Sequence, residues 1–216
     1  MRKSCLEQEK EGSVSYVNAM QEEGLISRRR ILTGITASAA ALMLGPLCRM
    51  AEAAQTDRST AGPLADVDIR NLSFYSPNTK EHLAVTYFEN GRYVRSALRK
   101  VNHHFRDHYC GRVHVIDPHL LDYLYSIKLE LGLTDPFFIL SGYRTPATNN
   151  MLRRHSRKVA KHSYHVYGRA VDIRVPGVTT AKLRRAAYRL RRGGVGYYRR
   201  EHFVHIDTGK FRAWWA

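Results

Sequence analysis

Two histidines and one aspartate have the types and spacing needed to hold a metal ion. His165 and Asp172 lie in the run Ser-Tyr-His-Val-Tyr-Gly-Arg-Ala-Val-Asp, and His205 follows in Phe-Val-His-Ile-Asp. A hydrolytic zinc site needs three nitrogen or oxygen ligands and one position left open for water. Imidazole and carboxylate groups both suit zinc. The three residues therefore predict a Zn²⁺ site of hydrolytic type.

The residues around Asp172 and His205 alternate in the manner of half-buried β-strands. Each of the two polar residues lies between two β-branched apolar residues. Successive side chains of a strand point to opposite faces, so Asp172 and His205 would both face away from the apolar core. If the two strands are neighbours, both side chains project into one groove. His165 could then complete the site from the preceding loop, in which Gly168 permits a tight turn.

The rest of the pattern predicts a single α+β domain. The order of elements is mixed and shows no repeat, which favours a largely antiparallel sheet packed with helices. Short or alternating apolar runs predict strands at 72–75, 83–88, 137–140, 171–175, 195–198 and 203–207. Apolar residues at helical spacing predict helices at 94–108, 118–131, 147–154 and 183–190.

A second pair of histidines is a weaker metal candidate. His104 and His108 would lie one turn apart on the helix predicted at 94–108. Residue 105 is a phenylalanine, whereas the helical zinc-protease motif needs a glutamate between its histidines. We therefore expect His104 and His108 to have structural roles.

Taken together, the motifs resemble a known family. Ser-x-His-x-x-Gly-x-Ala-x-Asp at 163–172, with a later histidine on a strand, is similar to the pattern of the zinc D-alanyl-D-alanine peptidases and their hedgehog-like relatives. The YcbK-like murein endopeptidases resemble the chain more closely over about residues 70–215. The shared segments are Ser-Gly-Tyr-Arg-Thr-Pro at 141–146, Gly-Val-Gly-Tyr-Tyr at 194–198, Phe-Val-His-Ile-Asp-Thr-Gly at 203–209 and Arg-x-Trp at 212–214.

This resemblance implies a fold, an activity and several residue roles. The fold would be hedgehog/DD-peptidase-like, and the activity would be zinc-dependent hydrolysis of peptide cross-links in peptidoglycan. His165, Asp172 and His205 would be the zinc ligands. Arg144 would contact the substrate and stabilise the oxyanion that develops during hydrolysis. We also expect Tyr143 and Ser163 to contribute to substrate binding.

The general base is the point at which this chain departs from the resemblance. The dipeptidase branch has an acidic residue three positions before the last histidine ligand, and YcbK-like members often have aspartate there. This chain has His202 at that position. Imidazole can act as a general base near neutral pH, so His202 is the first candidate. Glu201 and Asp207 are the alternatives.

The first residues predict export. Paired arginines at 28–30 precede a short, moderately apolar stretch from 31 to 48, and Ala-Glu-Ala-Ala at 51–54 resembles a cleavage site. This order is typical of a twin-arginine signal peptide spanning 1–54. Glycines and a proline interrupt the apolar stretch, which is too short for a stable membrane anchor. We interpret 55–66 as a linker and 67–216 as the zinc peptidase domain.

The charge of the mature chain favours an anionic partner. The whole chain has a formal net charge of +16, and removal of 1–54 leaves 28 basic and 13 acidic side chains. Export makes peptidoglycan a better candidate than nucleic acid, for which no recognition motif is present. We expect a monomer located in the periplasm or at the cell wall.

Two other functions are consistent with the same residues. One is a D-Ala-D-Ala carboxypeptidase or dipeptidase of the same fold. The other is a non-catalytic wall-binding module that keeps zinc for structure, which the replacement of the acidic base by His202 would favour. The products released from peptidoglycan fragments distinguish these functions from an endopeptidase.

Overall fold

The structure is a computed structural model, and it describes residues 68–216. The predicted signal at 1–54 and linker at 55–66 lie outside the described residues, so both stay predictions. The first strand begins at Ile69, close to the domain start that we predicted at residue 67. Within the described range, no helix combines the length and apolar character needed to cross a membrane.

The strands of the described range form one sheet with the order β3-β2-β1-β4-β5-β7-β6-β8. They are β1 (Ile69–Ser76), β2 (Glu81–Glu89), β3 (Arg92–Tyr93), β4 (Phe137–Ser141), β5 (Ala170–Arg174), β6 (Gly194–Tyr198), β7 (Phe203–Asp207) and β8 (Arg212–Trp215). β1 pairs with β4 in parallel, and β6 pairs with β8 in parallel. All other neighbours are antiparallel. The predicted α+β class with a largely antiparallel sheet is confirmed.

The described residues form four α-helices, three of which begin at a side chain that caps them. They are α2 (Arg95–His104), α3 (Pro118–Leu131), α4 (Pro146–His155) and α5 (Thr180–Leu190), with a short 3-10 helix η2 (Tyr164–Tyr167). The Asp117 side chain accepts the His119 N–H at the start of α3, and Gly132 ends that helix in the left-handed conformation. Thr145 caps α4 in the same way through Thr148 N–H. Both helices also have proline at the first position, where no hydrogen bond is lost.

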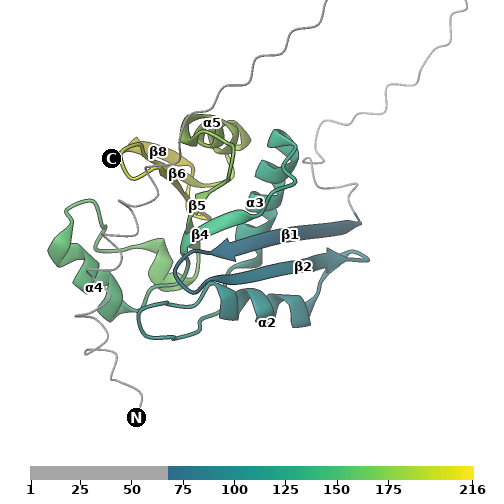
Figure 1. The fold of residues 1–216 in the computed structure, drawn as a ribbon, viewed down its shortest axis with the longest axis horizontal. Helices are drawn as coiled ribbons and strands as arrows, with labels where there is room; N and C mark the ends of the chain where they lie inside the picture. The colour runs from purple at the N-terminus through teal and green to yellow at the C-terminus, as the bar shows by residue number, and fades with distance from the viewer. Residues whose placement is uncertain (1–67) are drawn as a thin grey trace, which may run out of the picture.

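One face of the sheet carries the apolar core. Side chains from α2, α3 and α5 join one buried cluster with strand residues such as Leu72, Val171 and Val204. Figure 1 shows α2 alongside β2, and α3 and α5 beside the central strands. Because neighbouring residues of a strand point to opposite faces, Asp172 and His205 lie on the other face of the sheet.

Two local predictions were wrong. The helix predicted at 94–108 ends at His104, because Phe105 leaves the helical conformation and residues 107–112 form a turn closed by Asp107 N–H to Arg112 O. His104 and His108 therefore do not share one helix face. The terminal residues 212–215 form β8, for which we had predicted no strand. β8 depends on its pairing with β6, and a run of four residues carries little periodic signal of its own.

Candidate metal centre

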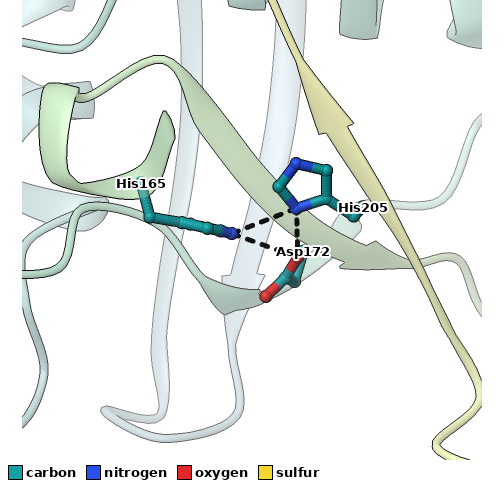
Figure 2. Close-up of side chains that lie close together, drawn as sticks. All are labelled: His165, Asp172 and His205. Atoms are coloured by element: carbon teal, nitrogen blue, oxygen red, sulfur yellow. Dashed lines mark hydrogen bonds and ion pairs between the residues drawn. The ribbon is translucent and has the colours of Figure 1, made fainter. Parts of the chain in front are cut away.

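Three buried side chains converge on one point, as Figure 2 shows. His165 Nε2 lies 3.2 Å from Asp172 Oδ1 and 3.1 Å from His205 Nδ1. His205 Nδ1 lies 2.9 Å from Asp172 Oδ1. Within residues 68–216, this is the one group of three or more metal-ligating side chains whose ligand atoms lie within 4.8 Å of one another. The structure thus brings together the three residues that we predicted as ligands.

Strand pairing explains how Asp172 and His205 meet. β5 and β7 are antiparallel neighbours, and Asp172 lies directly opposite His205. The apolar residues on either side of each ligand are fully buried in the core. A shift of the register by one residue would bury both polar side chains in the core, so the apolar residues hold the register. The alternation seen in the sequence therefore orients two of the three side chains.

The short helix η2 brings His165 to this pair. η2 ends at Gly168, which has a φ of 65°. A Cβ atom at Gly168 would lie 2.1 Å from the carbonyl oxygen of Val115, so any larger residue would push these segments apart. The Gly168 carbonyl also accepts the Asp117 N–H at 2.9 Å. Gly168 is therefore needed both for the left-handed turn and for the close approach of the loop before α3.

In each histidine, the ring nitrogen that faces away from Asp172, here called the rear nitrogen, also has a hydrogen-bond partner. His165 Nδ1 lies 2.7 Å from the Gly142 carbonyl oxygen, and His205 Nε2 lies 3.0 Å from Asp207 Oδ2. Both partners are acceptors, so the rear nitrogens carry the protons. Burial lowers the pKa of His205, but its hydrogen bonds to Asp172 and Asp207 outweigh that effect and raise the pKa, so a metal ion would replace a proton on His205 Nδ1. Metal-binding histidines typically have such an outer partner, and the set of donors therefore fits Zn²⁺.

Asp207 is committed to supporting His205. Its side chain is fully buried, and Arg212 donates to both of its oxygens at 2.9 and 2.7 Å. The backbone N–H of Gly209 donates to Oδ1 as well. Burial raises the pKa of Asp207, but the hydrogen bonds from His205 and Arg212 outweigh that effect and hold the pKa well below its usual range. Asp207 is thus an ionised outer partner of the site.

Arg144 lies beside the carboxylate of Asp172. Its side chain is buried, donates from Nε to Ser141 Oγ at 2.7 Å and forms an ion pair with Asp172 Oδ2. Burial raises the pKa of Asp172, but the charge of Arg144 helps to keep that pKa well below its usual range. Burial and the Arg144 charge lower the pKa of His165 to about 4, so its imidazole is neutral near neutral pH. Neutral imidazole and ionised carboxylate are the forms that bind metal.

The two predicted substrate-binding residues lie on segments next to the ligands. Ser163 is buried and precedes η2, where its carbonyl accepts the Val166 N–H at 3.1 Å. Tyr143 is half-buried, and its ring lies 4.6 Å from the ring of His114. Neither residue belongs to the convergent group. Their contact with a substrate stays a prediction.

The structure does not bring His202 into the convergent group. His202 is exposed in the turn between β6 and β7, with a φ of 56°. It lines a hollow of about 330 Å³ together with Ile173 and Leu183. Ile173 alternates with Asp172 along β5, so this hollow lies toward the core face. Glu201 in the same turn forms an ion pair with Lys158. The base therefore stays a prediction.

The sequence analysis did not predict which residues surround and orient His205. We had considered Asp207 only as a possible base, although it lies two residues after His205 and so faces the same side of β7. Arg212, on β8, was noted only for its place in the terminal motif. The Trp214 ring, also from β8, lies 5.3 Å from the His205 ring. The alternation could have identified Asp207, whereas Arg212 and Trp214 reach the site only because β8 joins the sheet.

Comparisons with known proteins identify the family. Residues 64–214 match the model of a family described as Peptidoglycan L,D-endopeptidase MepK. The chain belongs to this family. Peptidoglycan L,D-endopeptidase MepK of Escherichia coli (strain K12) is 44% identical over 145 residues, which are 67% of this chain and 80% of that protein. A Haemophilus influenzae protein named as a probable MepK is 41% identical over 146 residues, 67% of this chain and 78% of its own length.

The match confirms the resemblance that we inferred from the sequence. The family lies within the superfamily of zinc D-Ala-D-Ala peptidase-like proteins. The matched range contains all three convergent residues together with Arg144 and Asp207. A comparison with solved structures found no match.

Proposed function

We propose that the protein is a zinc-dependent murein endopeptidase that hydrolyses peptide cross-links in peptidoglycan. The observation that carries this proposal is the convergence of His165, Asp172 and His205, in a chain whose relatives are named as peptidoglycan L,D-endopeptidases. These three residues would hold Zn²⁺ through His165 Nε2, Asp172 Oδ1 and His205 Nδ1. When bound, the ion would supply Lewis acidity toward the scissile carbonyl.

In this proposal Arg144 binds the substrate and stabilises negative charge on the carbonyl oxygen. The ion pair with Asp172 and the hydrogen bond to Ser141 hold its guanidinium in place before a substrate arrives. A donor that is already oriented needs no reorganisation when charge develops, which makes its stabilisation larger than in water. Ser163 and Tyr143, on the adjoining segments, would complete the substrate-binding surface.

His202 is our candidate for the general base. Asp207 is occupied by His205 and Arg212, and Glu201 forms an ion pair with Lys158 through Oε1, so we rank both alternatives below His202. His202 is exposed and could receive a proton from solvent or substrate. To act on the scissile bond, the turn at 199–202 would have to bring its imidazole toward Asp172 when substrate binds.

The role of His202 has a direct test. We expect His202→Ala to lower turnover of cross-linked muropeptides by about 10²–10⁴-fold, because a general base contributes about that factor. The zinc content should be unchanged, since His202 is outside the ligand group. Arg200→Ala, an exposed change in the same turn, is the matched control. Wild-type turnover in the His202 variant would show that this base prediction is wrong.

The fold, the cellular location and the oligomeric state are also part of the proposal. We infer a hedgehog/DD-peptidase-like fold, because the family lies in that superfamily and the described residues form a largely antiparallel α+β domain. The twin-arginine pattern at 28–30 and the relatives' names support export to the periplasm, where peptidoglycan is the partner. We propose a monomer without a stable membrane anchor and without a nucleic-acid partner.

Product analysis tests the activity. The purified chain is incubated with cross-linked and with uncross-linked muropeptides, and the products are identified by mass spectrometry. We expect cross-linked dimers to yield monomers, a loss of this activity after chelation, and its recovery when Zn²⁺ is added. Full activity of metal-free protein would refute the zinc proposal. Release of terminal D-alanine alone would favour the carboxypeptidase instead, and binding to sacculi without any product would favour a non-catalytic module.

A further inference from the structure

Two aromatic side chains lie beside the metal centre, on the face of the sheet that carries Asp172 and His205. Tyr198 is on β6 and Trp214 is on β8, the two strands that follow β7 in the sheet order. Gly196 of β6 is directly opposite both His205 and Trp214. Directly opposite residues share a face, and Tyr198 lies two residues after Gly196, so both aromatic side chains face the side of His205. Both are half-buried and lie outside the apolar core.

Gly196 leaves the space that the Trp214 indole occupies. A Cβ atom at Gly196 would lie 2.6 Å from the Trp214 ring and 3.0 Å from the Cβ of His205. The indole therefore crosses β6 at Gly196, and the centre of its ring lies 5.3 Å from the centre of the His205 ring. Gly196 is thus required for the close approach of Trp214 to a candidate metal ligand.

The Tyr198 hydroxyl is directed toward this indole. Trp214 Nε1 donates to the Tyr198 hydroxyl at 3.4 Å. The Tyr198 ring stacks on Phe203, with ring centres 4.3 Å apart and an angle of 11° between the planes. Tyr198 pairs with Phe203, whereas Trp214 lies level with Gly196 and His205. The Tyr198 side chain therefore leans along β6, and its hydroxyl lies at the level of His205.

The Tyr198 hydroxyl has a proton that it can donate. Burial raises the pKa of Tyr198 above its usual value and outweighs the hydrogen bond from Trp214, which lowers it, so the hydroxyl is protonated near neutral pH. The charges of Asp172 and Arg144 act on the same pKa, so the hydroxyl is within their reach. Among residues 68–216, the hydroxyl accepts from Trp214 but donates to no acceptor. Its proton is therefore available to a molecule bound at the metal centre.

Arg144 and Tyr198 lie on opposite sides of the convergent group. Arg144 follows β4 and reaches Asp172 from that side. Tyr198 is on β6, beyond His205 of β7 in the sheet order. A peptide that crosses the sheet over the metal centre would therefore meet one donor on each side. Peptides present carbonyl and carboxylate oxygens, which accept hydrogen bonds from both kinds of donor.

We propose that Tyr198 is a substrate-binding residue, whose hydroxyl donates a hydrogen bond to a carbonyl or carboxylate oxygen of the peptide on the side opposite Arg144. Trp214 orients this hydroxyl through its own hydrogen bond. The inference rests on the proposed function for its substrate class, the peptides of peptidoglycan, and it adds a residue that binds them. It adds no ligand to the metal.

Steady-state kinetics of Tyr198→Phe test this role. The change removes one hydroxyl and keeps the ring that stacks on Phe203. We expect KM for cross-linked muropeptides to rise by about three- to tenfold, because a neutral hydrogen bond contributes about that factor. We expect little change in kcat, since the hydrogen bond is made before and during the reaction. A hydroxyl that only supports Trp214 would leave KM unchanged, and that result, or a fall in kcat alone, would overturn the proposal.

Tyr197 offers a matched control. It is the neighbour of Tyr198 on β6 and is also half-buried. Alternation places its ring on the other face of the sheet, where the guanidinium of Arg184 lies 5.6 Å from the ring centre. Tyr197→Phe removes the same group and should keep the wild-type KM. An equal rise of KM in both variants would contradict the proposal, because the effect would not depend on the face of the sheet.

Zinc content shows whether the effect of Tyr198→Phe is direct. The variant should hold as much zinc as the wild type, because the hydroxyl contacts none of the ligand atoms. If KM rises only together with a loss of zinc, the change acts through the metal centre and the proposed contact with substrate is wrong.

A binding measurement separates this inference from the peptidase proposal. Calorimetry with a soluble uncross-linked muropeptide needs no turnover, and Tyr198→Phe should weaken its binding by the same three- to tenfold factor, about the effect of one neutral hydrogen bond. If the wild type releases no product but binds this muropeptide more tightly than the variant does, the peptidase proposal fails and the role of Tyr198 stands. If the wild type is active and both proteins bind equally, only the role of Tyr198 fails.

Discussion

Two buried aspartates of this protein differ in what surrounds them. Asp122, on α3, accepts hydrogen bonds from Arg70 at 2.7 Å, Tyr87 at 3.0 Å and Tyr93 at 2.6 Å. Every partner at those distances is a donor, so the carboxylate is satisfied within the protein. Asp122 connects α3 to β1, β2 and β3 and so holds that end of the sheet together.

Asp172 has a different environment. Arg144 satisfies one of its oxygens, but the other faces His165 Nε2 and His205 Nδ1, two nitrogens that can bind a metal ion. The rear nitrogens of both rings are held by Gly142 and Asp207. One carboxylate oxygen and two imidazole nitrogens this close together can share a metal ion. Burial alone therefore does not mark a functional aspartate, whereas the orientation of its neighbours does.

Removal of one ligand is expected to have the largest effect. His165→Ala should abolish zinc binding and lower turnover by more than about 100-fold, because even loss of an outer partner costs metal sites about 10–100-fold. Metal analysis and turnover of cross-linked muropeptides measure both effects. His162→Ala, an exposed histidine nearby, is the control. A zinc-bound, fully active His165 variant would remove the distinction between the two aspartates.

Arg144 should matter for turnover more than for the metal. Arg144→Ala is expected to lower kcat by about 10²–10³-fold, as the loss of a donor to a developing oxyanion does in other hydrolases. Arg144→Lys should recover only part of the rate, because an ammonium lacks the planar fork that contacts both Ser141 and Asp172. Steady-state kinetics of zinc-loaded variants measure this. A change in KM with an unchanged kcat would instead indicate a role in substrate binding alone.

Asp207 should strengthen zinc affinity without binding the metal itself. We expect Asp207→Ala to weaken zinc affinity by about 10–100-fold, the usual effect of losing an outer partner of a histidine ligand. Asp207→Asn retains an acceptor for His205 and should lose less. Competition with a chelator of known affinity gives the values for both variants. Wild-type affinity in the alanine variant would show that His205 is oriented without Asp207.

Asp122 should affect folding and leave the metal in place. Asp122→Asn removes the charge that pairs with buried Arg70, and we expect the free energy of unfolding to fall by about 3–5 kcal/mol. Urea denaturation measures this loss, and metal analysis under native conditions should give the wild-type zinc content. A folded Asp122 variant that has lost its zinc would contradict the division between a structural and a functional carboxylate.

The sequence predicted the parts of the site that depend on local patterns. Alternation around Asp172 and His205 predicted the face of both side chains, and the pairing of β5 with β7 meets the condition under which we expected them to share a groove. The capping of α3 by Asp117 and its end at Gly132 were also readable, because both depend on residues next to the helix.

Other features could not be predicted from the sequence, because they depend on residues that lie far away in the chain. The end of α2 at His104 reflects the turn at 107–112 and the packing of Phe105 against Phe74. β8 exists through its pairing with β6, and only that pairing places Arg212 against Asp207. The position of His202 depends on the turn between β6 and β7. Its left-handed backbone conformation at His202 could not be predicted from a residue pattern.

The sequence by itself determined the ligand types, the face on which two of them lie and the family to which the chain belongs. Those properties follow from residue identity and from a period of two, which are local. The tertiary structure decided that His165 meets the other two ligands and that Gly142 and Asp207 contact the ring nitrogens that face away from Asp172. Such properties depend on which distant segments share a surface, and only the packing of the whole chain selects those segments.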